Sequence, residues 1–239
     1  MSVYACSDLH GNLNLYNQIK AYLVPEDKVY YLGDMADRHP QSWETLKAIM
    51  SDEQFIVLKG NHEDMLVNAM KEYHDEPTFF GFGNEISLLY QNGGAYTLDG
   101  WVNDGAHKGW IEYLNNLPLA AEYVNKNGQT LLMSHAGYTP TTKQNNFQWG
   151  EDLLWDRRHF FDAWPKDEVF KDTIIVHGHT PIQYIQDELN IEADSHFYCE
   201  GHKICLDCWT YRTKTTVLLD LDNLTFIPFS ENCEVNTNG

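Results

Sequence analysis

Short apolar runs alternate with amphipathic stretches along the first 60 residues of the chain. The runs at residues 3–6, 29–32 and 55–58 have the length and composition of buried strands. Between them, residues 13–23 and 43–50 space their apolar side chains as helices do, and Pro25 ends the first of these stretches. Strands that alternate with helices form βαβ units, so this part of the chain predicts a largely parallel sheet.

The pattern becomes mostly helical at about residues 64–118, with interruptions at Gly81, Gly83 and the pair Gly93-Gly94. We interpret this stretch as an insertion that covers the strand ends. Strand patterns return later, and the end of the chain has none. We therefore expect one domain over residues 1–230 and a flexible tail at residues 231–239. The later strand patterns fall at residues 121–124, 130–133, 173–176, 203–206 and 215–221.

Metal-competent side chains follow the predicted strands directly. In parallel sheets, ligands bind beyond the carboxyl ends of the strands, so we expect these side chains to meet at one edge. Taken strand by strand, they are Asp8 and His10; Asp34; Asn61 and His62; His135; and His177 and His179.

Mixed oxygen and imidazole donors of this kind suit Mn²⁺, Fe or Zn²⁺. They outnumber the ligands of one tetrahedral site, which favours a pair of ions bridged by a carboxylate. Any one Asp or His after a strand is more often a turn residue or a helix cap. Their recurrence at five strand ends, each beside a glycine that admits close backbone approach, favours a metal centre instead.

The charge and the cysteine pattern exclude several classes of function. The chain has 16 Lys and Arg against 35 Asp and Glu, a formal net charge of −19. Nucleic-acid binders usually carry a basic patch, so we expect no nucleic-acid partner. No apolar run approaches the roughly 18 residues of a membrane span, and no targeting segment precedes Asp8, so we expect no membrane association. The five cysteines lack disulfide-framework spacing, which predicts reduced thiols and a cytoplasmic protein.

Five short motifs contain the metal-competent side chains. They are Asp8-Leu9-His10-Gly11, Gly33-Asp34-Met35-Ala36-Asp37-Arg38, Gly60-Asn61-His62-Glu63, Ser134-His135-Ala136-Gly137 and Gly178-His179-Thr180-Pro181. In this order they resemble the signature of the calcineurin-like metallophosphoesterases. More narrowly, they resemble the phosphoprotein phosphatase branch, which includes bacterial and phage serine/threonine phosphatases and symmetrical dinucleoside tetraphosphatases. The resemblance spans roughly residues 3–182 and implies an α/β fold: a four-layer α-β-β-α sandwich of mixed sheets with helices outside.

The resemblance also implies a dinuclear metal centre, with Mn²⁺ as the preferred ion and Fe or Zn²⁺ as alternatives. One ion would be held by Asp8, His10 and a bridging Asp34, and the other by Asp34, Asn61, His135 and His179. Only the family pattern selects His179 over His177 as a ligand.

The same resemblance assigns roles to four further residues or contacts. His62 matches the general acid and Asp37 the residue that orients it. Arg38 and Arg157 match the arginines that bind phosphate, and Asn61 is a further substrate contact. Arg158, which is next to Arg157, is an alternative donor. The Asp-Arg pair is usually followed by glycine, where this chain has His39, which is either a substrate contact or a surface turn residue.

The function implied is hydrolysis of phosphoserine, phosphothreonine or phosphotyrosine in proteins, by direct attack of a metal-bridging hydroxide. The alternative is a symmetrical dinucleoside tetraphosphate hydrolase, with Phe79, Phe82 or Tyr96 as the pocket for a base. The substrate partner is thus a phosphorylated protein or a dinucleoside polyphosphate. A non-catalytic binding protein on the same fold is disfavoured, because the acid and both arginines are present.

Two features near the C-terminal end stand apart from this pattern. Cys208-Trp209 follows Asp207 where the family has Thr-Gly, so the contacts of that loop are open. In addition, Cys199, His202, Cys205 and Cys208 lie at three-residue intervals, as in a zinc site or a redox pair. Residues three apart on a strand point to opposite faces, which favours ordinary buried thiols.

Overall fold

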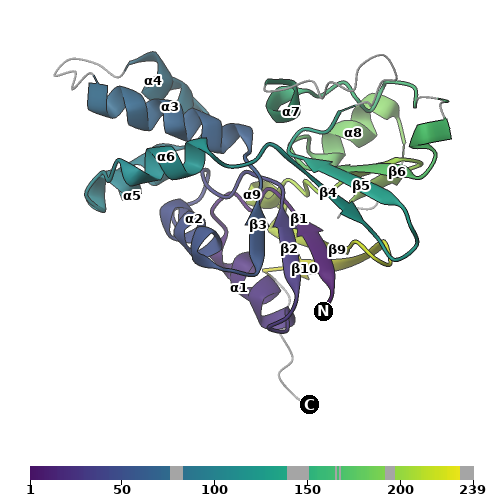
Figure 1. Ribbon diagram of the computed structural model, residues 1–239. Helices are drawn as coiled ribbons and strands as arrows, with labels where there is room; N and C mark the ends of the chain where they lie inside the picture. Colours follow the sequence, from purple (N-terminus) through teal and green to yellow (C-terminus); the bar gives the residue numbers. More distant parts are fainter. Residues whose placement is uncertain (76–82, 139–150, 165, 167, 192–196, 232–239) are drawn as a thin grey trace.

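The computed structural model describes residues 1–75, 83–138, 151–164, 166, 168–191 and 197–231. Two sheets form the centre of this part, with helices outside them (Figure 1). The strands are β1 (Val3–Cys6), β2 (Lys28–Tyr31), β3 (Phe55–Val57), β4 (Ala120–Val124), β5 (Thr130–Ser134), β6 (Thr173–His177), β7 (Tyr198–Glu200), β8 (Lys203–Cys205), β9 (Thr215–Asp220) and β10 (Thr225–Ser230). The helices are α1 (Leu13–Tyr22), α2 (Ser42–Ser51), α3 (Asn61–Asp75), α4 (Asn84–Gln91), α5 (Ala95–Asn103), α6 (Gly109–Asn115), α7 (Glu151–Trp155), α8 (Ile182–Leu189) and α9 (Thr210–Thr213), with a 3₁₀ turn at Glu168–Phe170.

Both sheets are mixed, and each has five strands in the described ranges. The first has the order β10-β9-β1-β2-β3 and the second β4-β5-β6-β8-β7. Strands β1, β2 and β3 are parallel to one another, as are β5, β6 and β8. The remaining strands pair antiparallel. The parallel arrangement expected for the first 60 residues is therefore confirmed for β1, β2 and β3. The predicted sandwich of mixed sheets with helices outside is confirmed.

Strand β1 is apolar along its whole length because both of its faces are buried. In β1, Val3 and Ala5 belong to the apolar cluster between the two sheets. Their neighbours Tyr4 and Cys6 belong to the cluster on the opposite face, beneath α1 and α2. Alternation along the strand therefore feeds two cores at once, and every position is apolar. This double burial fixes the sheet, and with it the loops that leave its carboxyl edge.

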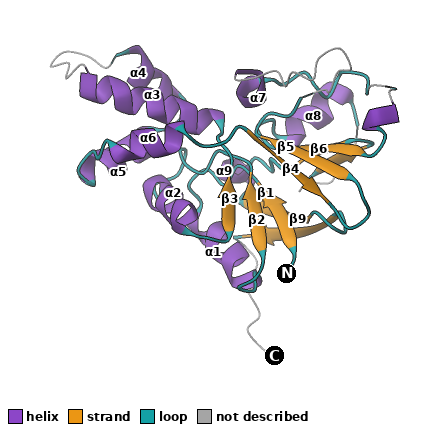
Figure 2. Cartoon of the chain, viewed as in Figure 1, coloured by secondary structure: helices purple, strands orange, loops and turns teal. Residues whose placement is uncertain are grey.

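Four helices, α3 to α6, occupy the range predicted as a helical insertion (Figure 2). Leu66, Leu89, Leu98 and Leu114 are buried in the same cluster as the helix-covered face of the first sheet. The division into one domain with an insertion at about 64–118 stays a prediction. Phe79, Phe82 and residues 232–239 of the predicted tail lie outside the described residues. Within the described ranges, no helix has both the length and the apolar character needed to cross a bilayer.

Leu66 provides a test of this shared core. Its side chain is 1% exposed, so Leu66→Ala leaves a cavity and should lower the free energy of unfolding by about 2–5 kcal/mol. The control is Leu88→Ala on α4, where the side chain is 41% exposed and the change should stay within about 0.5 kcal/mol. Chemical denaturation followed by circular dichroism measures both, and equal losses would contradict a core that includes α3.

Candidate metal centre and catalytic cleft

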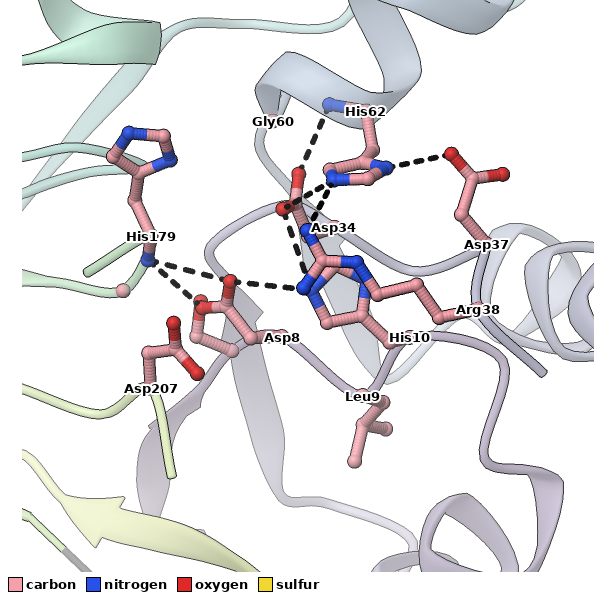
Figure 3. A network of polar contacts seen from close by, with 12 residues as sticks. Asp8, Leu9, His10, Asp34, Asp37, Arg38, Gly60, His62, His179 and Asp207 are labelled. Carbon is pink, nitrogen blue, oxygen red and sulfur yellow. Dashed lines mark hydrogen bonds and ion pairs between the residues drawn. The ribbon is translucent and has the colours of Figure 1, made fainter. Parts of the chain in front are cut away.

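The predicted metal ligands of the two sheets meet at one edge of the sandwich, and Figure 3 labels Asp8, His10, Asp34 and His179 among them. Loops after β1 and β2 and the start of α3 bring the ligands of the first sheet, and loops after β5 and β6 bring those of the second. All six side chains are buried, none more than 4% exposed. They are Asp8, His10, Asp34, Asn61, His135 and His179.

Two glycines permit the close approach of these loops. A Cβ atom at Gly178 would lie 1.9 Å from Oδ2 of Asp8, and one at Gly60 would lie 2.3 Å from Oδ1 of Asp34. The backbone of His179 then donates a hydrogen bond to Oδ2 of Asp8 at 3.1 Å, which joins the second sheet to the first. Any larger residue at either glycine would push a candidate ligand out of place.

The backbone of the centre is held in an uncommon conformation. Asp8, His10, Asp34, Asp37 and His179 all have φ between 46° and 72°, the left-handed region that residues with a Cβ rarely adopt. Each such residue costs on the order of 1–3 kcal/mol, and the cost persists only where surrounding contacts enforce it. Strain gathered in this way at one edge of the sheets marks that edge as functional.

Glu63 is the main support of these strained loops. Its carboxylate accepts hydrogen bonds from the backbone N–H groups of Asp34 and Met35, both at 2.8 Å, and of Gly60 at 2.9 Å. Burial and the charge of Asp34 raise the pKa of Glu63 to about 7 against the effect of these donors. Reasoning from the sequence gave Glu63 no role, although it directly follows His62 in one of the motifs.

The ring of His10 presents a bare nitrogen to two carboxylates. Its Nδ1 lies 3.1 Å from the carbonyl oxygen of Ala36, which requires a proton on Nδ1. Burial, with the nearby Arg38 charge, holds the pKa of His10 well below its ordinary value, so the ring is neutral and Nε2 is an acceptor. That Nε2 faces Oδ1 of Asp8 at 4.0 Å and Oδ2 of Asp34 at 3.7 Å. The unprotonated Nε2 of His10 therefore faces carboxyl oxygens, without a donor of its own to offer them.

His135 repeats this arrangement on the other side. Its Nδ1 lies 2.7 Å from the carbonyl oxygen of Leu32, and burial lowers its pKa, so its Nε2 is again an acceptor. This Nε2 lies 2.8 Å from Oδ1 of Asn61 and 3.3 Å from Oδ1 of Asp34. Nδ1 of His179 lies 3.0 Å from the same Asn61 oxygen. A cation among these atoms would satisfy them all, and a second imidazole nitrogen bonded to a backbone carbonyl is typical of metal-ligating histidines.

The donor atoms form two groups that share Asp34. Within each group the potential ligand atoms all lie within 4.8 Å of one another: His10, Asp34 and His62 in one, and Asp8, Asp34 and His135 in the other. The shared carboxylate fits the predicted bridging role of Asp34. The grouping differs from the prediction in pairing His62, not Asp8, with His10. These residues fit a pair of divalent ions by their chemistry, since buried carboxylates and neutral imidazoles are the donors such ions take.

Asp207 adds a further buried carboxyl group beside Asp8 (Figure 3). Burial raises the pKa of Asp207 to about 6, and burial with the charges of Asp207 and Asp34 raises the pKa of Asp8 well above its ordinary value. The backbone N–H of Trp209 donates to Asp207 at 2.8 Å. This hydrogen bond is a contact of the loop in which Cys208-Trp209 replaces the Thr-Gly of the family pattern. Crowded carboxyl groups of this kind are costly without positive charge between them.

His62 is held by a chain of hydrogen bonds that begins on α5. Its Nδ1 lies 2.6 Å from Oδ2 of Asp37. Thr97 in turn accepts from the backbone N–H of Asp37 at 3.1 Å and donates from its hydroxyl to Oδ1 of Asp37. Burial lowers the pKa of His62, but the carboxylates of Asp34 and Asp37 outweigh it, and the net shift is upward. The ring is thus oriented and its protonated form favoured. The sequence alone did not predict that Thr97 holds Asp37.

Both predicted arginines reach the cleft. Nη2 of Arg38 lies 3.0 Å from Nε2 of His62, and its backbone N–H donates to the carbonyl oxygen of Gly93 at 2.8 Å. Nη1 of Arg157 donates to the backbone oxygen of His179 at 2.9 Å. Arg158, the alternative donor, lies outside on the surface beside Asp156. His39 takes part in the turn before α2, where its Nδ1 accepts from the backbone N–H of Gln41 at 3.2 Å.

A cavity of about 200 Å³ connects these groups. Arg38, His62 and Arg157 line it together with the candidate ligands His10, Asp34, Asn61 and His179. Trp209 and Tyr211, from the loop into α9, form another part of its wall, and neither was predicted. Tyr96, expected as part of a base pocket, is 53% exposed on α5 and does not line this cavity.

His177 and the cysteine-rich segment lie apart from the cleft. Nδ1 of His177 lies 2.8 Å from the carbonyl oxygen of Gly178, and its buried ring packs against His159 with the centroids 4.3 Å apart. Cys205 and Cys208 belong to apolar clusters on opposite faces of the second sheet, as expected for residues three apart, whereas Cys199 is exposed. Neither candidate metal group in the described residues includes them.

Solved structures with the same fold come from phosphoesterases. A protein whose assignment as a diadenosine tetraphosphatase is provisional is 13% identical, with a TM-score of 0.57 over 97% of this chain and 94% of that one. A metallophosphoesterase from Sphaerobacter thermophilus is 16% identical, with a TM-score of 0.54 over 96% and 89%. A protein serine/threonine phosphatase from Saccharomyces cerevisiae, with similarity to human phosphatase PP5, is 16% identical, with a TM-score of 0.52 over 99% and 82%.

The chain is a hydrolase that acts on phosphoric esters. A family model described as calcineurin-like phosphoesterase matches residues 1–209, and the chain belongs to that family, which uses a dinuclear metal centre.

Asp34 and Asp37 form a matched pair for testing the metal centre. Both are buried and left-handed, a conformation that asparagine tolerates, but only Asp34 belongs to the candidate metal groups. Mn²⁺ at about 100 times its dissociation constant should stabilise chelator-treated protein by about 2.7 kcal/mol, which raises Tm by about 5–10 °C. Asp34→Asn should lose most of this shift and Asp37→Asn should keep it. Thermal shift assays measure it, and an unchanged shift in Asp34→Asn would contradict the bridging position.

Proposed function

We propose that this chain is a phosphomonoesterase that removes phosphate from phosphoserine, phosphothreonine or phosphotyrosine in proteins. One observation carries the proposal: His62, Arg38 and Arg157 line the same small cavity as Asp34, the carboxylate that the two candidate metal groups share. A proton donor, two guanidinium groups and a dinuclear centre are what direct hydrolysis of a phosphoric ester needs.

The proposed ligands are Asp8, His10 and Asp34 for one ion and Asp34, Asn61, His135 and His179 for the other. Oxygen and imidazole donors without a thiolate favour Mn²⁺, with Fe or Zn²⁺ as alternatives. When bound, two such ions supply a hydroxide nucleophile at neutral pH by lowering the pKa of water.

Arg38 and Arg157 are proposed to bind the phosphoryl oxygens. They approach the cavity from different elements: Arg38 from the loop after β2, and Arg157 from the segment after α7. A planar guanidinium forms paired hydrogen bonds with two oxygens of one phosphoryl group. Two of them, together with the amide of Asn61, orient phosphorus toward the metal centre and stabilise the charge that develops on its oxygens.

His62 is proposed to protonate the leaving oxygen. Its Nδ1–H donates to Asp37, so the second proton of the imidazolium form would sit on Nε2, which faces Oδ2 of Asp34 at 3.8 Å. Nη2 of Arg38, which lies 3.0 Å from Nε2, must move away for Nε2 to carry that proton. As the bond from phosphorus to the ester oxygen breaks, its electron pair goes to that oxygen, which takes the proton from Nε2. Asp37 stabilises the charge on the imidazolium beforehand and keeps the ring in place.

The substrate class is proposed from the motifs and the compact cavity. Hydrolysis of a dinucleoside tetraphosphate is the second candidate, favoured by the likeness to the structure provisionally assigned as a diadenosine tetraphosphatase. We also propose a cytoplasmic location, because the five cysteines lack the spacing of a disulfide framework, as expected in a reducing compartment.

A substrate panel tests the proposed reaction. With Mn²⁺, the protein should release phosphate from p-nitrophenyl phosphate and from phosphopeptides, and chelation should abolish the release. Fe²⁺ and Zn²⁺ in place of Mn²⁺ rank the metals, and metal analysis of each sample confirms loading. Failure to hydrolyse any ester in a fully metallated sample would contradict the proposal. Turnover of diadenosine tetraphosphate far above that of phosphopeptides would favour the second candidate.

His62→Asn tests the proton donor. Loss of general acid catalysis should lower kcat on a phosphoserine peptide by about 10²- to 10⁴-fold, with metal content unchanged. The loss should be smaller on p-nitrophenyl phosphate, because nitrophenolate is a weak base that leaves without a proton. Asp37→Asn should show the same dependence on the leaving group to a lesser degree. Equal losses of metal and activity would instead make His62 a ligand, as its place in one candidate group allows.

A further inference from the structure

The N-cap residue of α9 and its first turn place two aromatic side chains in the wall of the cleft. Trp209 and Tyr211 both line the cavity that holds Arg38, His62 and Arg157. Both are partly exposed, although the residues around them in the loop, Cys208 and Thr210, are buried. The aromatic surface therefore faces the space where a substrate must sit, and the core does not require it.

Trp209 occupies this place at a conformational cost. Its φ is 58° and its ψ 44°, in the left-handed region, where the family pattern has glycine. A residue with a large side chain in this region costs on the order of 1–3 kcal/mol. The surrounding hydrogen bonds enforce it: Asp207 accepts from the backbone N–H of Trp209, and the Trp209 carbonyl accepts from the N–H groups of Arg212 at 2.8 Å and Thr213 at 3.1 Å. Strain maintained in this way at a cleft indicates that the side chain has a role there.

Tyr211 lies on the side of the cleft where the leaving group departs. The guanidinium of Arg38 sits over its ring, 4.7 Å from the centroid, and the same guanidinium is 3.0 Å from Nε2 of His62. The ring also meets His10 edge-on, with the centroids 6.0 Å apart. An ester oxygen within reach of His62 would therefore lie beside Arg38, and the ring of Tyr211 lies on the far side of that guanidinium.

Arg212 covers one face of Trp209 from outside. Its guanidinium lies 4.3 Å from the centroid of the indole, which lies edge-on to Tyr211 at 6.2 Å. Arg212 also lies over the ring of Tyr211, 5.7 Å from its centroid, so Tyr211 contacts both Arg38 and Arg212. Such stacking fixes each ring at little entropic cost on binding, so the surface is already in place for a flat partner.

We propose that Trp209 and Tyr211 form an aromatic wall that selects phosphoric esters with an aromatic leaving group, such as a phosphotyrosine side chain, over esters of serine and threonine. The proposal rests on the proposed phosphomonoesterase function and narrows its substrate class. A ring attached to the ester oxygen would lie in stacked or edge-on contact with the wall, whereas a serine side chain is too short to reach it. The cavity of about 200 Å³ is below the roughly 300–1,000 Å³ of sites for larger ligands, which favours one phosphoryl group with one ring over a dinucleotide.

The test compares kcat/KM for two peptides that differ only in carrying phosphotyrosine or phosphoserine. The readout is kcat/KM for the phosphotyrosine peptide divided by kcat/KM for the phosphoserine peptide, because a general loss of activity cancels in this ratio. Tyr211→Leu should lower the ratio by about tenfold, which corresponds to the upper range of the energy of an aromatic pair. Tyr211→Phe keeps the ring and should keep the ratio. Tyr184→Leu, the same change at an exposed position on α8, is the matched control.

Trp209→Gly is the second variant, chosen so that failure to fold does not obscure the result. Glycine adopts the left-handed conformation of position 209 readily, so the loop should persist without the indole. This variant should also lower the ratio, with its metal content and Tm retained. An unchanged ratio in both Tyr211→Leu and Trp209→Gly overturns the proposal. So does a selective loss of diadenosine tetraphosphate turnover, which would make the wall a base site.

The proposal and the function beneath it fail in different ways. If neither peptide is hydrolysed by fully metallated wild-type protein, the phosphomonoesterase function is wrong. If both are hydrolysed and wild type favours phosphoserine, the function stands and the aromatic wall is wrong.

Discussion

The structure depends on a cluster of hydrogen-bond acceptors that face one another where the two sheets meet. Unprotonated imidazole nitrogens of His10 and His135 face oxygens of Asp34 and Asn61. Protein folding normally avoids such an arrangement, because a buried acceptor without a donor costs free energy. Here the rest of the sandwich maintains it. The double burial of the strands, the glycines that let loops approach and the carboxylate of Glu63 all hold acceptors together that would otherwise separate.

Each layer of the fold contributes one part of the chemistry. The first sheet provides Asp34, the proposed bridging carboxylate, and the second provides His135 and His179. Helix α5 provides Thr97, which holds Asp37 and through it the proposed proton donor His62. Because these parts come from distant segments, the cleft exists only in the folded sandwich. The aromatic wall comes from a third direction, the loop into α9, and meets the same cavity from the side of Arg38.

The sequence predicted the candidate ligands better than it predicted the architecture around them. Strand ends are places where a short apolar run stops at Gly-Asp or Gly-Asn, and this local signal located Asp34 and Asn61 correctly at one edge. It failed for β7, in which only Tyr198 is buried, and for β10, which contains Pro228. The proline is tolerated because β10 lies at the sheet edge. It could not find contacts between distant segments either. Thr97 acts on Asp37 across 60 positions of the chain, and no periodicity reports such a contact.

The hydrogen bonds between Thr97 and Asp37 tie the proton donor to a helix that carries none of the candidate metal ligands. Proteins open in cooperative units well below the free energy of global unfolding. If α5 separated from the first sheet in such an opening, Asp37 and His62 would lose their orientation while the ligands on both sheets stayed assembled. With the proposed roles, catalytic competence and ion retention would depend on different regions of the molecule, and they need not disappear at the same temperature or denaturant concentration.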